Sequence, residues 1–154
     1  MPPLDDTVRV DRVPVADTYR LRQQVLRPGS PPSSVHMAVD GDPATAAFAA
    51  RTAAGEVVGT AVVMPEPCPW LPDRPGTWRL RGMATAEGHR GGGIGARVLR
   101  AVLDHVAAAG GTLVWCNARV PARRFYERAG FTAHGEEWTD PHIGPHVAMW
   151  RPVP

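Results

Sequence analysis

The chain has 154 residues, a length that suits one domain with one hydrophobic core. Hydrophobic residues make up 44% of it, which argues against disorder, and no apolar run approaches the roughly 18 residues of a membrane-spanning helix. A formal net charge of +2 is too small to indicate nucleic-acid binding. We therefore predict a single domain over residues 1–154 with no nucleic-acid or membrane partner. Because no basic-then-apolar leader opens the sequence, we expect a cytoplasmic protein.

The first part of the chain predicts one strand and one helix. A frayed terminus is expected over Met1–Thr7. Apolar and polar residues then alternate from Val8 to Val13, which is typical of a strand. Asp17 is placed to cap a helix that runs to about Leu26, and Pro28-Gly29 ends that helix.

The middle of the chain predicts a hairpin followed by an irregular segment. Residues 44–51 and 57–64 indicate two strands joined across Ala54-Gly55-Glu56. Five prolines within Pro65–Gly76 exclude regular structure there. We expect Trp70 to anchor this excursion at one end of the sheet.

Strand-like and helix-like segments alternate in the second half. Strands are predicted at Trp78–Thr85, Thr112–Cys116, Phe131–Trp138 and His146–Trp150, and helices at Gly93–Ala109 and Pro121–Gly130. A turn-rich loop is expected over Asp140–Pro145. Because Thr112–Cys116 is almost continuously apolar, it belongs in mid-sheet. The order of elements predicts an α/β (α+β) fold with a mixed sheet and helices on both faces.

The most informative stretch is Arg90-Gly91-Gly92-Gly93-Ile94-Gly95-Ala96, here called the glycine loop. It lies between a predicted strand and a predicted helix. Glycines allow positive φ, so that consecutive N–H groups turn toward one point. The helix that follows adds its own unpaired N–H groups and the positive end of its dipole. With the forked cation of Arg90 beside them, these groups predict a binding site for phosphate.

Two motifs together resemble the GNAT superfamily of acyl-CoA N-acyltransferases. Arg90, Gly93 and Gly95 match its pyrophosphate-loop pattern Arg/Gln-x-x-Gly-x-Gly/Ala, and Phe125–Phe131 resembles its closing Tyr-x-x-x-Gly-Phe signature. The motifs stand in the family's order, about 30 residues apart. The resemblance implies a mostly antiparallel sheet in which the strands holding Thr85 and Cys116 splay apart to receive the pantetheine arm.

Two other interpretations of the glycine loop stay open. Gly91-x-Gly93-x-x-Ala96 also fits the dinucleotide fingerprint. That fingerprint needs a tight strand-to-helix turn, whereas the six residues Thr85–Arg90 intervene here, and no acidic residue follows at the distance that would hold a ribose. The loop could also simply start a helix.

The resemblance implies acetyl-CoA as co-substrate and a set of residues that hold it. The backbone of one strand end would pair with pantetheine, the glycine loop would hold the pyrophosphate, and an asparagine would contact pantetheine. The family places that asparagine where this chain has Arg119, two residues after its one asparagine, so either side chain is a candidate. The implied binding residues are Met83, Ala84, Thr85, Arg90, Gly91, Gly92, Gly93, Ile94, Gly95, Ala96, Asn117 and Arg119.

The implied catalytic residues are Tyr126 and His146. A tyrosine at this place in the signature protonates the departing thiolate or steadies its sulfur, a role that suits a phenol. The attacking amine must lose a proton, and His146, Glu66, His36 or water would accept it. A metal site is not expected, because Gly144 and Pro145 break the helix that would align His142 with His146.

We expect an N-acetyltransferase that moves an acetyl group to an amine of a small molecule or peptide by direct attack, since no cysteine or serine is visibly activated as a relay. The alternative is a non-catalytic module that binds acyl-CoA as a sensor or that binds a partner. Dimers are common in the family, which leaves a homodimer open, although no seam marks one in the sequence. The sequence does not identify the acceptor amine.

Overall fold

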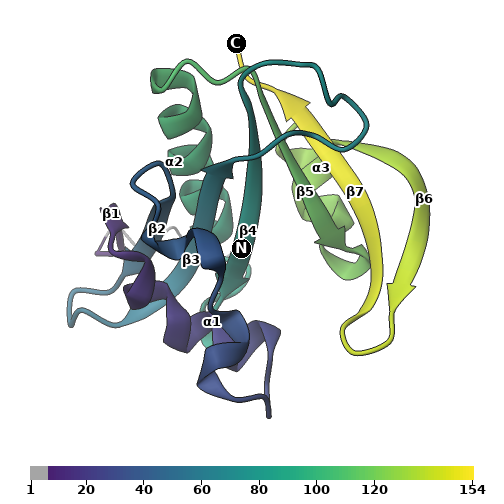
Figure 1. Cartoon of the computed structure of the whole chain (residues 1–154). Coiled ribbons are helices and arrows are strands. Elements are labelled where there is room, and N and C mark those ends of the chain that lie inside the picture. Colours follow the sequence, from purple (N-terminus) through teal and green to yellow (C-terminus); the bar gives the residue numbers. More distant parts are fainter. Residues whose placement is uncertain (1–6) are drawn as a thin grey trace.

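The computed structural model describes residues 7–154, so most of the expected frayed terminus, Met1–Asp6, lies outside the described residues. Its centre is a seven-stranded sheet in the order β1-β2-β3-β4-β5-β7-β6 (Figure 1). All neighbouring strands are antiparallel except β4 and β5, which are parallel. The strands are β1 Arg9–Val13, β2 Ala46–Arg51, β3 Val57–Pro65, β4 Thr77–Thr85, β5 Leu113–Arg119, β6 Thr132–Asp140 and β7 Gly144–Pro152. The predicted mixed sheet is confirmed, with Thr112–Cys116 in its middle.

Within the described residues, three α-helices and five short 3-10 segments connect the strands. The helices are α1 Tyr19–Leu26, α2 Ile94–Ala108 and α3 Arg123–Arg128, and the 3-10 segments are η1 Val15–Thr18, η2 Pro32–Val35, η3 Ala38–Gly41, η4 Glu87–His89 and η5 Val120–Ala122. The predicted cap at Asp17 is wrong, because the chain enters α1 through η1 and Thr18 is the N-cap, with no side-chain cap bond. The loop predicted after Asp140 is also shorter, since β6 and β7 leave only residues 141–143 between them. In residues 7–154, no helix combines the length and apolar character needed to cross a membrane.

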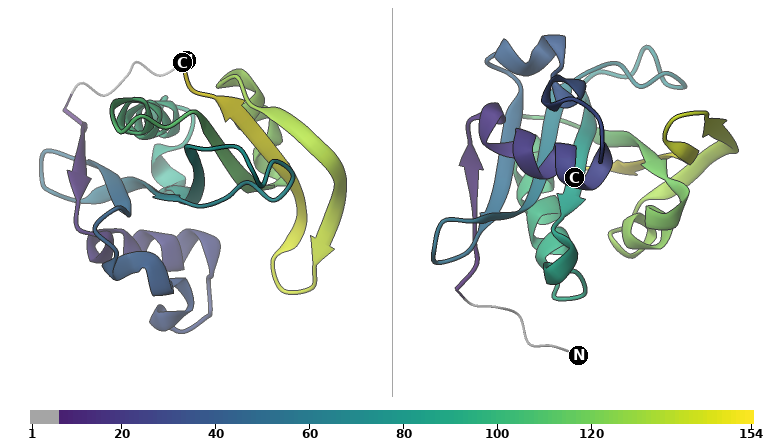
Figure 2. Two further views of the ribbon diagram at one scale, coloured as in Figure 1. Left: turned by 45° about the horizontal axis from the view of Figure 1, so that its top comes forward. Right: turned by 90° about the horizontal axis from the view of Figure 1, so that it is seen from below.

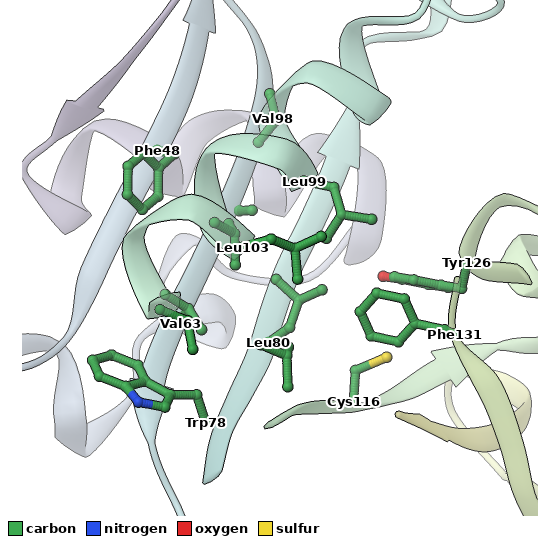
Figure 3. Packing of buried hydrophobic residues seen from close by; sticks show 14 of the residues in the cluster. Phe48, Val63, Trp78, Leu80, Val98, Leu99, Leu103, Cys116, Tyr126 and Phe131 are labelled. Carbon is green, nitrogen blue, oxygen red and sulfur yellow. The ribbon is translucent and has the colours of Figure 1, made fainter. Parts of the chain in front are cut away.

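Side-chain alternation divides the sheet into two faces. On β3, Val63 belongs to the large core cluster that includes α2, whereas Val62 belongs to a second cluster on the opposite side. Figure 3 shows Leu99 and Leu103 of α2 packed over Val63 and Leu80. The left view in Figure 2 places α1 on the other side of the sheet from α2. We call these sides the α2 face and the α1 face.

The parallel strands β4 and β5 separate after a short contact. They pair only at Thr77↔Leu113, Trp78↔Val114 and Arg79↔Trp115, and then diverge for the rest of their length (Figure 1). The backbone groups along the facing edges beyond that point therefore lack a ladder partner. This is the splaying that the sequence resemblance implied for the strands holding Thr85 and Cys116.

The proline-rich segment braces the paired end of β4 and β5. Trp70 packs edge-on against Trp115, with ring centroids 5.9 Å apart, and stacks on His134 at 4.4 Å. Cys68 and Leu113 complete a small buried cluster around these rings. The predicted anchoring role of Trp70 is thus confirmed, and the closed end of the strand pair is the well-packed end.

Candidate functional site

A cleft of about 800 Å³ opens where β4 and β5 diverge. Its walls come from α1 and η2, from the two diverging strands, from α3 and from the turn between β6 and β7. Eight predicted site residues line it: Met83, Ala84, Thr85, Arg90, Asn117, Arg119, Tyr126 and His146. The remaining predicted residues, Gly91–Ala96, lie outside its lining, and Gly95 of that stretch approaches Thr85 and Phe125 in the wall. One cavity thus gathers residues that are far apart in sequence.

The glycine loop enters α2 through two left-handed residues. Gly91 has φ 83° and Gly93, the N-cap of α2, has φ 81°, a region that favours glycine. Gly95 differs from the expectation, because it lies inside the helix without positive φ. A Cβ at Gly95 would come 3.1 Å from the ring of Phe125, so this glycine permits close packing of α2 on α3.

Arg90 is tied to the end of β4. Its Nε donates to the carbonyl of Thr85 at 3.2 Å, and its side chain is exposed at the edge of the cleft. The first N–H groups of α2 have no acceptor within the helix. The Arg90 guanidinium at the edge of the cleft therefore lies next to the unpaired N–H groups and the dipole of the α2 start, just outside the lining, and all three favour an anion.

A β-bulge shapes the open edge of β4. The register with β3 shifts between Thr60↔Ala84 and Val62↔Arg81, so that Gly82 and Met83 together face Ala61. Gly82 has φ 62°, and its carbonyl accepts from the Thr60 hydroxyl at 2.9 Å. The bulge bends the strand beside the cleft and re-aims Met83, Ala84 and Thr85, the three residues that the sequence singled out here.

Tyr126 is buried in the wall that α3 contributes. It is 5% exposed, and Figure 3 shows its ring beside Phe131 and Cys116, with the hydroxyl directed toward the side of α2 and β4. Among residues 7–154 its hydroxyl has no hydrogen-bond partner. Burial, and to a smaller extent neighbouring Cys116, raises the pKa of Tyr126 well above its usual value. The phenol is therefore held in its protonated, proton-donating form.

Cys116 lines the same cleft but is not an activated nucleophile. Burial raises the pKa of its thiol to about 12. Since the thiolate is the reactive form, this cysteine is inert at neutral pH. Cys68 is also fully buried, as expected for an ordinary packed thiol.

His146 lies on the α1 face, opposite the side from which Tyr126 comes. Val147 and Met149 of β7 belong to the core on the α2 face, so alternation turns His146 the other way. Its Nδ1 is 2.8 Å from the carbonyl oxygen of Gly144, and its ring stacks on Trp138 at 5.7 Å. Because a carbonyl only accepts, Nδ1 carries the proton and Nε2 of the neutral ring keeps a free lone pair.

The two other candidate bases, His36 and Glu66, differ from His146 in their position and their contacts. His36 is exposed on the rim of the cleft and lies against the Tyr19 ring at 4.3 Å. Glu66, which the sequence also offered as a base, is not among the lining residues of the cleft. Its carboxylate accepts from Arg79 at 3.1 Å. An ion pair of this kind leaves Glu66 poorly placed to take a proton from a ligand.

Sequence reasoning missed the arginines of the α1 face. Arg79 and Arg81 flank Leu80, whose side chain packs on the α2 face, so both point toward α1. That alternation was visible in the sequence, but nothing in the sequence indicated that both would line a cavity. The lining contains six arginines and a single carboxylate, Asp140; the arginines are Arg22, Arg27, Arg79, Arg81, Arg90 and Arg119.

Comparisons with known proteins agree with this geometry. A family model described as "Acetyltransferase (GNAT) family" matches residues 15–131. The uncharacterized N-acetyltransferase YitI of Bacillus subtilis (strain 168) is 32% identical over 155 residues, which cover 94% of this chain and 95% of YitI.

Solved structures share the fold at lower identity. Escherichia coli ElaA has a TM-score of 0.76 at 17% identity, over 94% of this chain and 99% of its own. An aminoglycoside 6'-N-acetyltransferase complexed with coenzyme A has a TM-score of 0.70 at 15% identity, over 94% of this chain and 97% of its own. Because the family match includes both the glycine loop and the Tyr126 motif, the chain belongs to the GNAT family of acetyltransferases.

Proposed function

We propose that this acyltransferase moves an acetyl group from acetyl-CoA to an amine by direct attack while both substrates are bound. The observation that carries the proposal is the divergence of β4 and β5 beside the glycine-capped start of α2. An extended chain with phosphates at one end fits this arrangement, because the strand edges offer backbone pairing and the helix start offers anion binding. A structural neighbour complexed with coenzyme A supports the choice of ligand.

The glycine loop and Arg90 would hold the pyrophosphate, and the backbone of Met83, Ala84 and Thr85 would pair with pantetheine. For the side-chain contact we favour Asn117 over Arg119. A terminal nitrogen of Arg119 already donates to the carbonyl of Leu26 at 2.6 Å, whereas Asn117 is exposed in the cleft and its side chain has no hydrogen bond among residues 7–154.

His146 and Tyr126, on opposite sides of the sheet, would carry out the two proton transfers of the reaction. As the new C–N bond forms, Nε2 of His146 accepts the proton that the amine loses. As the C–S bond breaks, the Tyr126 hydroxyl donates a proton or a hydrogen bond to the leaving sulfur. The raised pKa values of Cys116 and Tyr126 support a path with no covalent acyl-enzyme.

Paired binding and turnover measurements test the proposal. Titration calorimetry with acetyl-CoA should give saturable binding, and a panel of amines should release free CoA thiol. Arg90→Glu should weaken acetyl-CoA binding at least tenfold, because a carboxylate would stand where the pyrophosphate binds. Arg100→Glu, on the exposed side of α2, makes the same charge change and should leave affinity within about twofold.

If a folded Arg90→Glu protein binds acetyl-CoA with unchanged affinity, Arg90 and the glycine loop do not hold the pyrophosphate. Tight acetyl-CoA binding without thiol release from any amine would instead favour the acyl-CoA sensor.

A further inference from the structure

The α1 face of the cleft is more cationic than acetyl-CoA alone explains. Four of its arginines, Arg22, Arg27, Arg81 and Arg119, have no carboxylate within salt-bridge distance among residues 7–154. Only Arg79 is paired, with Glu66. Clustered guanidiniums without counter-ions are unfavourable in the free protein and attract an anionic ligand.

The arginines lie close enough to influence one another. Partial shielding from water and nearby Arg79 are the main causes that lower the pKa of Arg81. Glu66 opposes them, and Arg22 and Arg27 add smaller lowering effects. Burial and Arg27 lower the pKa of Arg119 in the same way. The positive charge is therefore concentrated in one region.

Two of these arginines make side-chain hydrogen bonds within the protein, and two do not. Arg22 is 4% exposed, and its guanidinium donates to the Thr18 hydroxyl and to the carbonyl of Val35, while its Nε remains buried without a partner. Arg119 donates to Leu26. Arg27 and Arg81 have no side-chain hydrogen bond among the described residues, so their charged ends are available to a ligand.

The other end of the α1 face has the opposite character. Asp140, the single carboxylate of the lining, lies near His146, which contributes to the lowered pKa of Asp140 after the backbone N–H groups of His142 and Ile143. His146 pairs with Arg119 across β5 and β7 and shares its face. Asp140 therefore favours an ammonium group at its end of the face, and Arg27 and Arg81 favour an anion at theirs.

We infer that the acceptor is an amine that also carries an anionic oxygen group, a carboxylate or a phosphate, bound by Arg27 and Arg81 while its nitrogen faces His146. This inference rests on the proposed function, because it takes the α2 face to be the acetyl-CoA side and leaves the α1 face for the acceptor. A forked guanidinium matches either oxyanion.

Matched amine pairs test the inference. β-Alanine is compared with β-alaninamide, and 2-aminoethyl phosphate with ethanolamine, with spermidine as a cationic amine. The anionic member of at least one pair should have a kcat/KM at least tenfold higher, and the two pairs separate carboxylate from phosphate. The comparison is stringent, because a nearby anion also raises the pKa of an amine and reduces its reactive fraction.

Arg81→Ala should raise KM for the preferred anionic amine by roughly 10- to 100-fold, the range expected when a charge-assisted hydrogen bond is lost. It should change KM for the neutral partner less than about threefold and leave acetyl-CoA affinity unchanged. Arg20→Ala removes an exposed arginine of α1 that does not line the cleft, and should behave as wild type.

Calorimetry also measures the binding of each amine to the protein saturated with CoA. This measurement tests the inference even if no amine is acetylated. Preference for the neutral or cationic amines, no binding of either anionic amine, or an equal effect of Arg81→Ala on both members of a pair would overturn it. Anionic amines that bind the CoA complex but are never acetylated would uphold it and contradict the proposed function instead.

Discussion

At the scale of single residues, Tyr126 and His146 line the same cleft from opposite sides of the sheet. Burial keeps the proton on Tyr126, and the carbonyl of Gly144 keeps the proton of His146 on Nδ1. Tyr126 can therefore donate a proton, and Nε2 of the neutral His146 ring can accept one. Their different faces suit an addition–elimination reaction, in which the attacking nitrogen and the leaving sulfur are separate substituents of one tetrahedral carbon.

Tyr126→Phe should lower kcat by about 10- to 1000-fold and leave KM for acetyl-CoA within about threefold. The ring and its packing are kept, and only an interaction made as the sulfur leaves is lost. Tyr19→Phe is the matched control. It removes the other tyrosine hydroxyl, which donates to Asp40 at 2.6 Å and does not line the cleft, so kcat should not change. Wild-type turnover by Tyr126→Phe would show that the thiolate finds its proton elsewhere.

His146→Ala should lower kcat/KM by about 100- to 10,000-fold, because Nε2 of His146 can no longer accept the proton of the amine. The rate should be measured as a function of pH in both proteins. No falling limb from Tyr126 is expected below about pH 10. Its pKa in the folded enzyme lies above its ordinary value, so the phenol keeps its proton throughout that range. An unchanged kcat/KM in His146→Ala would assign the proton transfer to His36, to water or to an amine that binds already neutral.

At the scale of elements, α2 begins and ends on glycines with nearly the same backbone. Gly93 at the start has φ 81°, and Gly110 just past the end has φ 79°. A β-carbon in this region costs about 1–2 kcal/mol at either position. The two ends differ in function, since only the first belongs to the proposed phosphate site.

Gly93→Ala and Gly110→Ala should therefore lower the melting temperature by similar amounts. Acetyl-CoA should raise the melting temperature further, and only Gly93→Ala should reduce that further rise. A β-carbon at position 93 disfavours the positive φ that directs the N–H groups of the glycine loop toward the proposed phosphate site. Equal ligand-induced shifts in both variants would mean that Gly93 serves α2 alone.

At the scale of the whole molecule, the proline-rich segment stabilises the closed end of the cleft. Trp70→Ala should destabilise the protein by about 2 kcal/mol, because a half-buried indole loses its contacts with Trp115 and His134. Urea unfolding measures this, and an unchanged midpoint would make Trp70 dispensable. Because Trp115 lies in the last β4–β5 pair, acetyl-CoA affinity should fall as well.

The sequence predicted the features that depend on residues close together in the chain, and it did not predict those that depend on tertiary packing. Gly93 and Tyr126 belong to short motifs whose backbone requirements can be read in a few residues. The arginine cluster could not be predicted, because Arg27 and Arg81 meet only through the packing of α1 on β4. Gly95 was assigned the wrong physical reason, since its neighbour Phe125 lies 30 residues away in sequence.

The short contact between β4 and β5 has a thermodynamic consequence. Three residue pairs join the block β1–β4 to the block β5–β7–β6, so the hydrogen-bond ladder is nearly interrupted in mid-sheet. An extended ligand that fills the gap acts as a missing strand and makes the seven-stranded sheet continuous. Folding and ligand concentration are then linked, and a ligand at 100 times its Kd adds about 2.7 kcal/mol to the stability of the whole chain.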